Sequence, residues 1–279
     1  LDATCGSGSF LVQAMVKELA DCRKGLTESD AISLIEDIKK KHIFGIENEE
    51  KAYGLATTNM LIHGDGNSNI RFDSCFNCEE FIKEANPDII LMNPPYNAKP
   101  IGIPDRYKNN WGKAKDGKED PTKGFVFIQF LSDVIKSINR DRERKRLPKK
   151  TVKLAVLLPV SAAIGTSSIL QTSKAEMLKD NRLEAVFTLP SEIFYPGAAV
   201  NVCCMVFTLG LPHQNADGTT NETFFGFYRE DGFKKKKNLG RIEQFDADGN
   251  SKWRKIEEDW LKLFRNKKVV DGLSATAEV

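Results

Sequence analysis

The first eleven residues of the chain decide its fold class, and they read LDATCGSGSFL (residues 1–11). Apolar residues recur at helical spacing behind the glycines, so the stretch predicts the end of a strand, a glycine turn and a helix over residues 8–24. Gly6 and Gly8 lack a Cβ, which lets the backbone of the turn approach a ligand closely. We therefore expect a ligand site where the first strand of an α/β fold passes into its helix.

The chemistry of this turn favours a methyl donor over a nucleotide phosphate. A dinucleotide-binding turn would need a third glycine at the position of Leu11, and no Gly-Lys-Ser/Thr follows to form a phosphate loop. Asp2 would repel a pyrophosphate, whereas it suits the amino group in the methionyl tail of S-adenosylmethionine. The residues assigned to the donor site here are Asp2, Gly6, Ser7, Gly8 and Phe10.

A second motif follows the apolar run 88–92, which predicts a buried strand ended by Asn93, Pro94, Pro95 and Tyr96. The two prolines stiffen the turn because each ring fixes φ at about −65°. The Asn93 side-chain oxygen and the Pro94 carbonyl can then accept hydrogen bonds from one planar NH2 group, while Tyr96 offers a face for stacking. Two acceptors would localise the lone pair of adenine N6 toward a methyl donor. The alternative is a strand-ending turn without chemistry.

Together, the two motifs resemble those of the amino-adenine DNA methyltransferases, in the class whose donor motif precedes Asn-Pro-Pro-Tyr. The chain most resembles the modification (methyltransferase) subunit of type I restriction–modification systems. The likeness extends to residues 189–197, to Asp231-Gly232-Phe233 and to residues 238–241. Ala3 stands where the family usually carries proline, and the chain begins inside the donor motif. We therefore expect an amino-terminally truncated relative of that subunit.

The resemblance implies the fold, the reaction and the partners. The expected fold is the S-adenosylmethionine-dependent methyltransferase fold, and the expected reaction is direct methyl transfer from S-adenosyl-L-methionine to adenine N6. Double-stranded DNA is the implied substrate, and separate specificity and restriction subunits are the implied partners. In-line transfer requires neither a metal nor a covalent enzyme intermediate.

Two further acids are predicted to hold the donor. Residues 42–47 and 69–74 predict short strands whose acids are Glu47 and Asp73. Because ligands of a doubly wound sheet bind beyond the carboxyl ends of its strands, Glu47 is placed to accept hydrogen bonds from ribose hydroxyls. By resemblance, Asp73 accepts from the amino group of the donor adenine, with Phe72 or Cys75 lining the ring. The rivals are a helix-start role for Glu47, and Asp65 in place of Asp73.

Strands and helices alternate along the rest of the chain, which predicts a doubly wound, mostly parallel α/β sheet. The last two apolar strands, 183–189 and 200–209, are expected to pair as an antiparallel hairpin at its edge. A helix beginning at residue 124 presents an apolar stripe that we assign to the core: Phe125, Ile128, Leu131, Ile135 and Ile138. We divide the chain into a catalytic core, residues 1–235, and a peripheral carboxyl-terminal extension, residues 236–279.

Two segments beside the Asn-Pro-Pro-Tyr turn could meet DNA. Residues 97–123 lack apolar periodicity and carry several lysines, so we predict a mobile loop that closes over an extruded base and contacts phosphates. A solvated loop without function is the alternative. By resemblance, Phe194 is the residue that stacks on the target base, with Tyr195 as second choice; a core phenylalanine is the alternative.

The composition is that of a water-soluble enzyme core. The 279 residues are 41% hydrophobic, and 41 lysines and arginines nearly balance 39 acids, for a net charge of +2. Six cysteines without regular spacing, and the lack of a signal peptide, favour a cytoplasmic protein with reduced thiols. Cys75 and Cys78 have no second ligand pair, so we expect no metal. No apolar stretch is long enough to span a membrane.

Two other functions remain open from the sequence. A planar NH2 group is also the acceptor in enzymes that methylate a glutamine amide of translation release factors or an adenine of RNA. Alternatively, the fragment is inactive without its specificity subunit.

Overall fold

The computed structural model describes residues 1–22, 27–64, 69–96, 102–117, 119–197 and 200–279. Helices and strands alternate through the first two thirds of the chain, as the sequence predicts. The helices are α1 (Ser9–Cys22), α2 (Glu28–Lys41), α3 (Glu50–Ile62), α4 (Glu79–Ala85), α5 (Phe125–Arg144), α6 (Val160–Ile164), α7 (Ser168–Asp180) and α8 (Lys252–Arg265). The strands are β1 (Phe44–Glu47), β2 (Asn69–Phe72), β3 (Ile89–Met92), β4 (Val152–Pro159), β5 (Asn181–Thr188), β6 (Val202–Leu209), β7 (Glu222–Phe227), β8 (Phe233–Lys236), β9 (Gly240–Glu243) and β10 (Ser274–Glu278).

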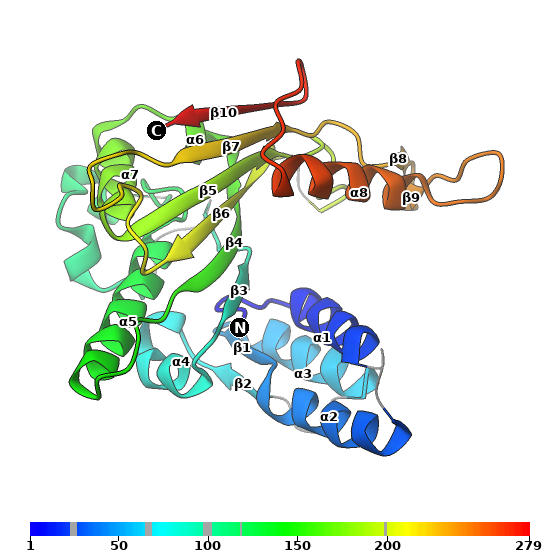
Figure 1. Cartoon of the computed structure of the whole chain (residues 1–279), viewed down its shortest axis with the longest axis horizontal. Coiled ribbons are helices and arrows are strands. Elements are labelled where there is room, and N and C mark those ends of the chain that lie inside the picture. The colour runs from blue at the N-terminus through cyan, green and yellow to red at the C-terminus, as the bar shows by residue number, and fades with distance from the viewer. Residues whose placement is uncertain (23–26, 65–68, 97–101, 118, 198–199) are drawn as a thin grey trace.

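The strands form one mixed surface joined through the first residues of the chain. Six strands are ordered β10-β7-β5-β6-β4-β3, and β1 pairs with β2 in parallel. Asp2 bridges to Gly45 of β1, and the Leu91 N–H of β3 donates to the Leu1 carbonyl at 3.0 Å. Residues 1–3 therefore lie between β1 and β3 and connect the two parts (Figure 1). The pairs β3–β4 and β5–β7 are parallel, which brings several carboxyl ends to one edge.

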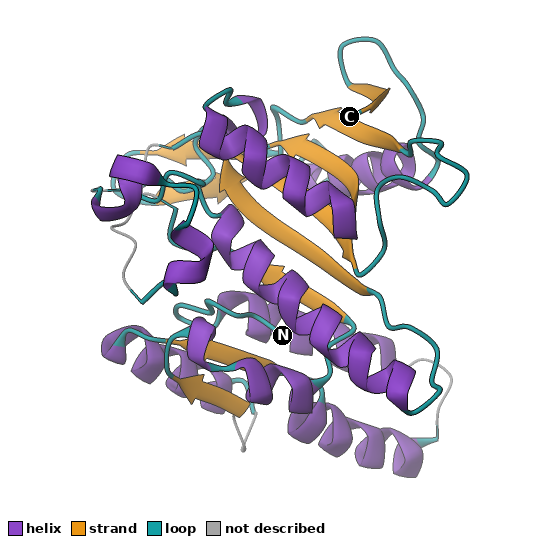
Figure 2. Cartoon of the chain, turned by 90° about the vertical axis from the view of Figure 1, so that its left-hand side faces the viewer, coloured by secondary structure: helices purple, strands orange, loops and turns teal. Residues whose placement is uncertain are grey.

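Helices cover both faces of this surface, as a doubly wound fold requires. Helices α1, α2 and α3 lie on one side, and α4, α5 and α7 lie on the other (Figure 1). Figure 2 looks onto the second side, where α5 crosses in front of the strands. The stripe predicted for α5 is buried throughout, so its assignment to the core is confirmed. A smaller core cluster packs α1 and α3 against β1 around Met15, Ala56 and Met60.

The predicted antiparallel hairpin forms, but its position differs from the expectation. β5 and β6 pair antiparallel, and β6 also pairs antiparallel with β4. The hairpin is not the edge of the sheet, because β7 adds to β5 and β10 then adds to β7. The short polar sequence of β10 gave no apolar pattern from which this pairing could be predicted. The division at residue 235 stays a prediction, although β10 and the Phe264–Phe224 ring contact join residues beyond it to the sheet.

The segment predicted as a mobile loop is partly outside the described residues, namely at 97–101 and 118. In its described parts, short 3-10 turns occupy Asp105–Lys108 and Gly112–Asp116. Ile103 and Trp111 are buried in the main core cluster. Whether the segment closes over a base stays a prediction.

Candidate active site

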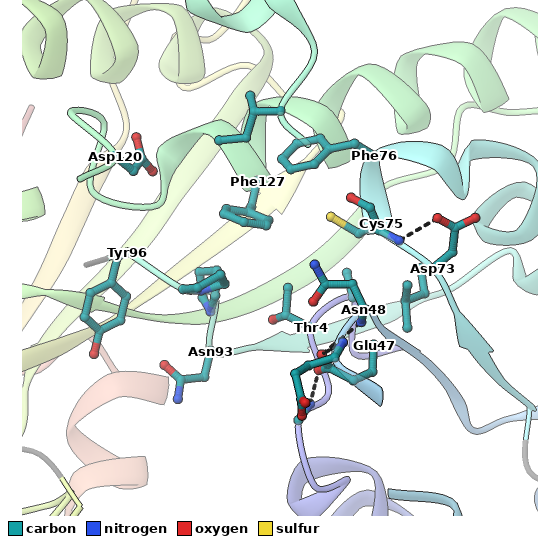
Figure 3. A pocket seen from close by; sticks show the side chains of 18 residues that line it. Thr4, Glu47, Asn48, Asp73, Cys75, Phe76, Asn93, Tyr96, Asp120 and Phe127 are labelled. Carbon is teal, nitrogen blue, oxygen red and sulfur yellow. Dashed lines mark hydrogen bonds between the residues drawn. The ribbon is translucent and has the colours of Figure 1, made fainter. Parts of the chain in front are cut away.

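A cavity of about 650 Å³ opens at the carboxyl ends of β1, β2 and β3. It brings together residues from both predicted motifs, although they are far apart in the chain (Figure 3). In Figure 3, Asn93 and Tyr96 lie on one side of the cavity and Glu47 and Asp73 on the other. The predicted residues that line it are Gly6, Glu47, Asp73, Asn93, Pro94, Pro95 and Tyr96.

Glu47 is fixed in place by three backbone donors. Its Oε2 accepts from the Gly6 N–H at 2.8 Å, and its Oε1 accepts from the N–H groups of Asn48 at 2.9 Å and Glu49 at 2.8 Å. The side chain is therefore oriented without any ligand. A carboxylate has about four acceptor positions, so one position on Oε2 remains for a hydroxyl in the cavity. The helix-start role belongs instead to Glu49, whose side chain accepts from the Ala52 N–H as the cap of α3.

Asp73 follows β2 and presents one occupied and one available oxygen. Its Oδ1 accepts from the Ser74 N–H at 2.7 Å and from Asn77 Nδ2 at 2.9 Å. In the described part of the chain, no hydrogen bond reaches Oδ2. An exposed acceptor of this kind fits an amino group, whereas the rival Asp65 lies outside the described residues. Cys75 lines the cavity, while the ring of Phe72 packs on Tyr53 and is not part of the wall.

The Asn93–Tyr96 turn follows β3 directly. Asn93 is exposed, and its amide makes no hydrogen bond with any described residue. Pro94 and Tyr96 are buried, and both border the cavity. Burial raises the pKa of Tyr96, which keeps its phenol neutral. The turn thus presents an amide oxygen with free acceptor capacity beside an aromatic wall.

A second turn, residues 120–124, packs against the Asn93–Tyr96 turn. Gly124, at the start of α5, has φ +97°, and a Cβ there would lie 2.6 Å from Leu158 Cδ2 and 3.4 Å from Pro94 Cγ. Asp120 fixes the conformation, because its Oδ2 accepts from the Gly124 N–H at 2.8 Å and its Oδ1 from the Thr122 N–H at 2.8 Å. Burial raises the pKa of Asp120. The close approach of Gly124 therefore packs α5 against the Asn93–Tyr96 turn.

The remaining residues predicted for the donor site are not among those that line the cavity. Asp2 is 2% exposed, and its Oδ1 accepts from the Thr4 N–H at 3.0 Å. Gly8 has φ +81°, and a Cβ there would come within 3.3 Å of Ala56. The Ser7 carbonyl accepts a hydrogen bond from Asn59 Nδ2 at 2.8 Å. Phe10 is half-buried in the first turn of α1. These contacts shape the glycine turn, and a direct contact of these residues with a donor stays a prediction.

Phe194 is not among the residues that line the cavity. It lies half-buried in the turn after β5 and packs against the main core cluster. Its partial burial does not decide between the two alternatives, and stacking on a target base stays a prediction.

Several residues of the cavity wall were not predicted from the sequence. Ala3 and Thr4 belong to the glycine motif but were given no role, and most of the others have no motif and reach the wall only through the fold. The Thr4 hydroxyl is buried without a hydrogen-bond partner among the described residues. The rings of Phe76 and Phe127 pack together with their centres 5.0 Å apart. The unpredicted lining residues are Ala3, Thr4, Ile46, Asn48, Glu49, Ser74, Phe76, Ile103, Asp120 and Phe127.

The sheet order and the position of the cavity define a class. An α/β sheet whose first strand lies between β1 and β3, with β6 antiparallel beside β4 and a site at the carboxyl ends, has the fold of the S-adenosylmethionine-dependent methyltransferases. The sequence profile of the N-6 DNA Methylase family matches residues 1–265. The chain therefore belongs to that family.

Individual relatives agree with this assignment. The chain is 29% identical over 253 residues to the type II restriction enzyme and methyltransferase RM.BcgI of Heyndrickxia coagulans. The alignment covers 90% of this chain and 33% of that protein. It is 24% identical over 232 residues to the type I restriction enzyme EcoEI methylase subunit of Escherichia coli, which covers 79% of this chain and 41% of that one. The chain thus spans less than half the length of these relatives.

Solved structures show the same fold. A modification subunit assigned to a type I restriction enzyme of Vibrio vulnificus YJ016 superposes with a TM-score of 0.63 at 20% identity, over 99% of this chain and 50% of that one. The type I restriction-modification methyltransferase subunit of Streptococcus thermophilus superposes with a TM-score of 0.57 at 21% identity. This superposition also covers 99% of this chain and 50% of that one.

No group of three or more histidine, cysteine or acidic side chains that could hold a metal ion occurs among the described residues. Across the same ranges, no helix is both long and apolar enough to cross a bilayer. The six cysteines, all described, are free thiols.

Proposed function

We propose that the chain transfers the methyl group of S-adenosyl-L-methionine to adenine N6 in DNA, as the modification subunit of a restriction–modification system. The observation that carries the proposal is the single cavity lined by Glu47 and Asp73 on one side and by Asn93 and Tyr96 on the other. The first pair are acceptors suited to a donor nucleoside. The second pair are an acceptor and an aromatic wall suited to a planar amine.

The residues present fit the donor. The free acceptor position of Glu47 suits a ribose hydroxyl, Oδ2 of Asp73 suits the adenine amino group, and the unpartnered Thr4 hydroxyl offers a further hydrogen bond. When bound, S-adenosylmethionine supplies an electrophilic methyl group. The protein's own part is to hold the acceptor amine in line with that methyl, which is catalysis by proximity and orientation.

On the acceptor side, Asn93 and the Pro94 carbonyl would accept from the two N6 hydrogens, and Tyr96 would border the base. A base inside a duplex cannot reach such a cavity, so the target must be extruded at a cost of a few kcal/mol. Stacking, at about 1–3 kcal/mol per base, offsets part of that cost. Phe194 is proposed as a second stacking residue that reaches the base once it is extruded.

The partners follow from the relatives, one of which is named a methylase subunit and the other a combined restriction enzyme and methyltransferase. We propose double-stranded DNA as substrate, a separate specificity subunit that selects the sequence, a restriction subunit, and a cytoplasmic location. The division into a core, residues 1–235, and a carboxyl-terminal extension belongs to the same proposal.

Calorimetric titration with S-adenosylmethionine, with NAD as control, tests the donor site first. Binding of S-adenosylmethionine alone is expected. If S-adenosylmethionine does not bind, or if NAD binds instead, the proposal is refuted.

The acceptor is tested by transfer of a labelled methyl group. Duplex DNA, RNA and a release factor are offered in parallel, with and without the specificity subunit. Label on N6 of adenine in DNA is the expected product. Label on RNA adenine or on a glutamine amide would keep the donor site and replace the substrate.

A further inference from the structure

The β8–β9 hairpin carries an unusual charge distribution, and we call residues 233–243 the lysine hairpin. Four consecutive lysines, 234–237, occupy its first strand and turn, in a chain whose net charge is only +2. Opposed residues of an antiparallel pair share a face and successive residues alternate. The register pairs Lys235 with Arg241 on one face, and Lys234 with Ile242 and Lys236 with Gly240 on the other.

The face of Lys235 is held against the rest of the molecule. Lys235 Nζ lies 3.1 Å from Glu192 Oε1 and 4.2 Å from the centre of the Tyr195 ring. Arg241 pairs with the buried Asp231 at 2.7 Å. Both cations of this face are therefore neutralised internally, and they fix the orientation of the hairpin.

The other face is different. Lys234 and Lys236 are exposed, as is Lys237 in the turn, and none of the three forms an ion pair within the described ranges. Residues two apart on a strand are about 7 Å apart, so the ammonium groups of Lys234 and Lys236 can contact one polyanionic strand together. A fixed row of unpaired ammonium groups is suited to phosphates, because neutralising them releases condensed counterions.

The position of the lysine hairpin links it to the cavity. Glu192 and Tyr195 follow β5, which runs antiparallel to β6, as β4 does, while β3 is parallel to β4. The carboxyl ends of β5 and β3 therefore lie at the same edge, and the cavity opens at that edge. Figure 1 shows the hairpin projecting on the same side of the sheet as α1.

From these observations, we infer that the outward face of the lysine hairpin binds the phosphates of duplex DNA beside the extruded base. Lys234 and Lys236 are the contacting residues, and Lys235 and Arg241 position them. The inference rests on the proposed function, since it takes the ligand of the cavity edge to be DNA. It adds a sequence-independent contact, separate from base recognition, that the motifs of the cavity do not supply.

The test compares two double variants with the same loss of charge. The first is Lys234→Gln with Lys236→Gln. The control is Lys145→Gln with Lys149→Gln, which removes two exposed lysines between α5 and β4, at the opposite edge of the sheet. Binding of a non-specific duplex is measured by fluorescence anisotropy between about 50 and 200 mM salt, a range over which phosphate contacts dominate.

Each phosphate contact contributes about 0.9 to the slope of log affinity against log salt. The first double variant should therefore make the negative slope shallower by about 1.8, and the control should leave it unchanged. An unchanged slope in the first variant, an equal decrease in the control, or no duplex binding by the parent chain at low salt would overturn the inference. Equal binding and equal loss on an RNA strand of the same length would assign the surface to RNA and overturn it as well.

S-adenosylmethionine affinity, measured in the same samples, separates this inference from the proposed function. Neither pair of lysines touches the cavity, so the donor should bind all three proteins equally. Normal donor binding, together with an unchanged salt slope in the Lys234→Gln, Lys236→Gln variant, would refute only the inference about the lysine hairpin. Failure of the parent chain to bind the donor would instead refute the proposed function.

Discussion

The Gly6 N–H donates a hydrogen bond to Oε2 of Glu47 at 2.8 Å, across 41 residues of sequence. This bond joins the glycine turn after the first strand to the end of β1. Two of the three loops expected to hold the donor are thus fixed relative to each other before any ligand arrives. Such preorganisation reduces the entropy lost on binding.

Replacing Glu47 by Gln should weaken S-adenosylmethionine binding about tenfold or more, because hydrogen bonds to a charged group contribute about 1.5–3 kcal/mol. The amide would also turn an N–H group toward one of the backbone donors of Gly6, Asn48 or Glu49. Stability should therefore fall by about 1–3 kcal/mol. Calorimetry and urea unfolding measure the two effects.

Glu84→Gln is the matched control for that variant, since Glu84 is exposed on α4 and does not line the cavity. It should leave both quantities within experimental error. If Glu47→Gln kept full donor affinity, Glu47 would be a structural carboxylate rather than a ribose ligand.

Asn93→Ala should reduce methyl transfer about 10²-fold or more, because it removes an oriented acceptor that holds the amine. Donor affinity should stay within about twofold, because Asn93 lies on the acceptor side of the cavity. A twofold change corresponds to well under the 1.4 kcal/mol that a tenfold change would require. Transfer of labelled methyl groups and calorimetry give the two readouts. Asn266→Ala, at an exposed asparagine after α8 that neither lines the cavity nor belongs to residues 97–123, is the control. Equal loss of donor binding and transfer would contradict the role of Asn93.

Gly124→Ala should destabilise the chain by about 1–3 kcal/mol through overpacking, because its Cβ would meet Leu158 at 2.6 Å. Strain at φ +97° adds to this. Gly218→Ala isolates the strain, since Gly218 has φ +84° but nothing within 4 Å of its Cβ. Urea unfolding should give a clearly lower free energy of unfolding for Gly124→Ala than for Gly218→Ala. Equal losses would mean that the packing of α5 on Pro94 contributes nothing.

Asp2 should make stability depend on pH in a direction opposite to that of most acids. Burial raises the pKa of Asp2 to about 7, whereas an unfolded aspartate titrates near about 3.9. The folded chain therefore binds more protons between these values. The stability contributed by Asp2 is complete below about pH 4 and is lost as the pH rises through about 7.

Asp2→Asn removes this titration and keeps an acceptor for the Thr4 N–H. The free energy of unfolding of the parent chain, minus that of the variant, should decrease as the pH rises from about 4 to 7, by at most about 1.4 kcal/mol per unit. Urea unfolding at several pH values provides the comparison. A difference that is constant or increases over that range would show that Asp2 ionises normally in the folded chain.

Local sequence predicted most of the elements that position the site. Apolar periodicity predicted the helix behind the glycine turn, observed as α1, and the buried stripe of α5. The strands that end at Glu47 and Met92 were identified because a short apolar run meets a polar residue or a proline turn. β10 was missed, since an edge strand such as Ser274–Glu278 has no apolar alternation and is defined by its partner.

The sequence by itself determined the α/β class, the glycine turn and the Asn-Pro-Pro-Tyr turn, because each depends on residues adjacent in the chain. Only the tertiary structure decided which of these residues share a cavity, and that Thr4, Phe127 and Asp120 complete its wall. It also decided that Phe194 packs on the core, and that Lys235 is neutralised while Lys234 and Lys236 are not. The reason is physical: backbone propensity acts over a few residues, whereas burial and charge pairing depend on segments that meet only after the sheet has formed.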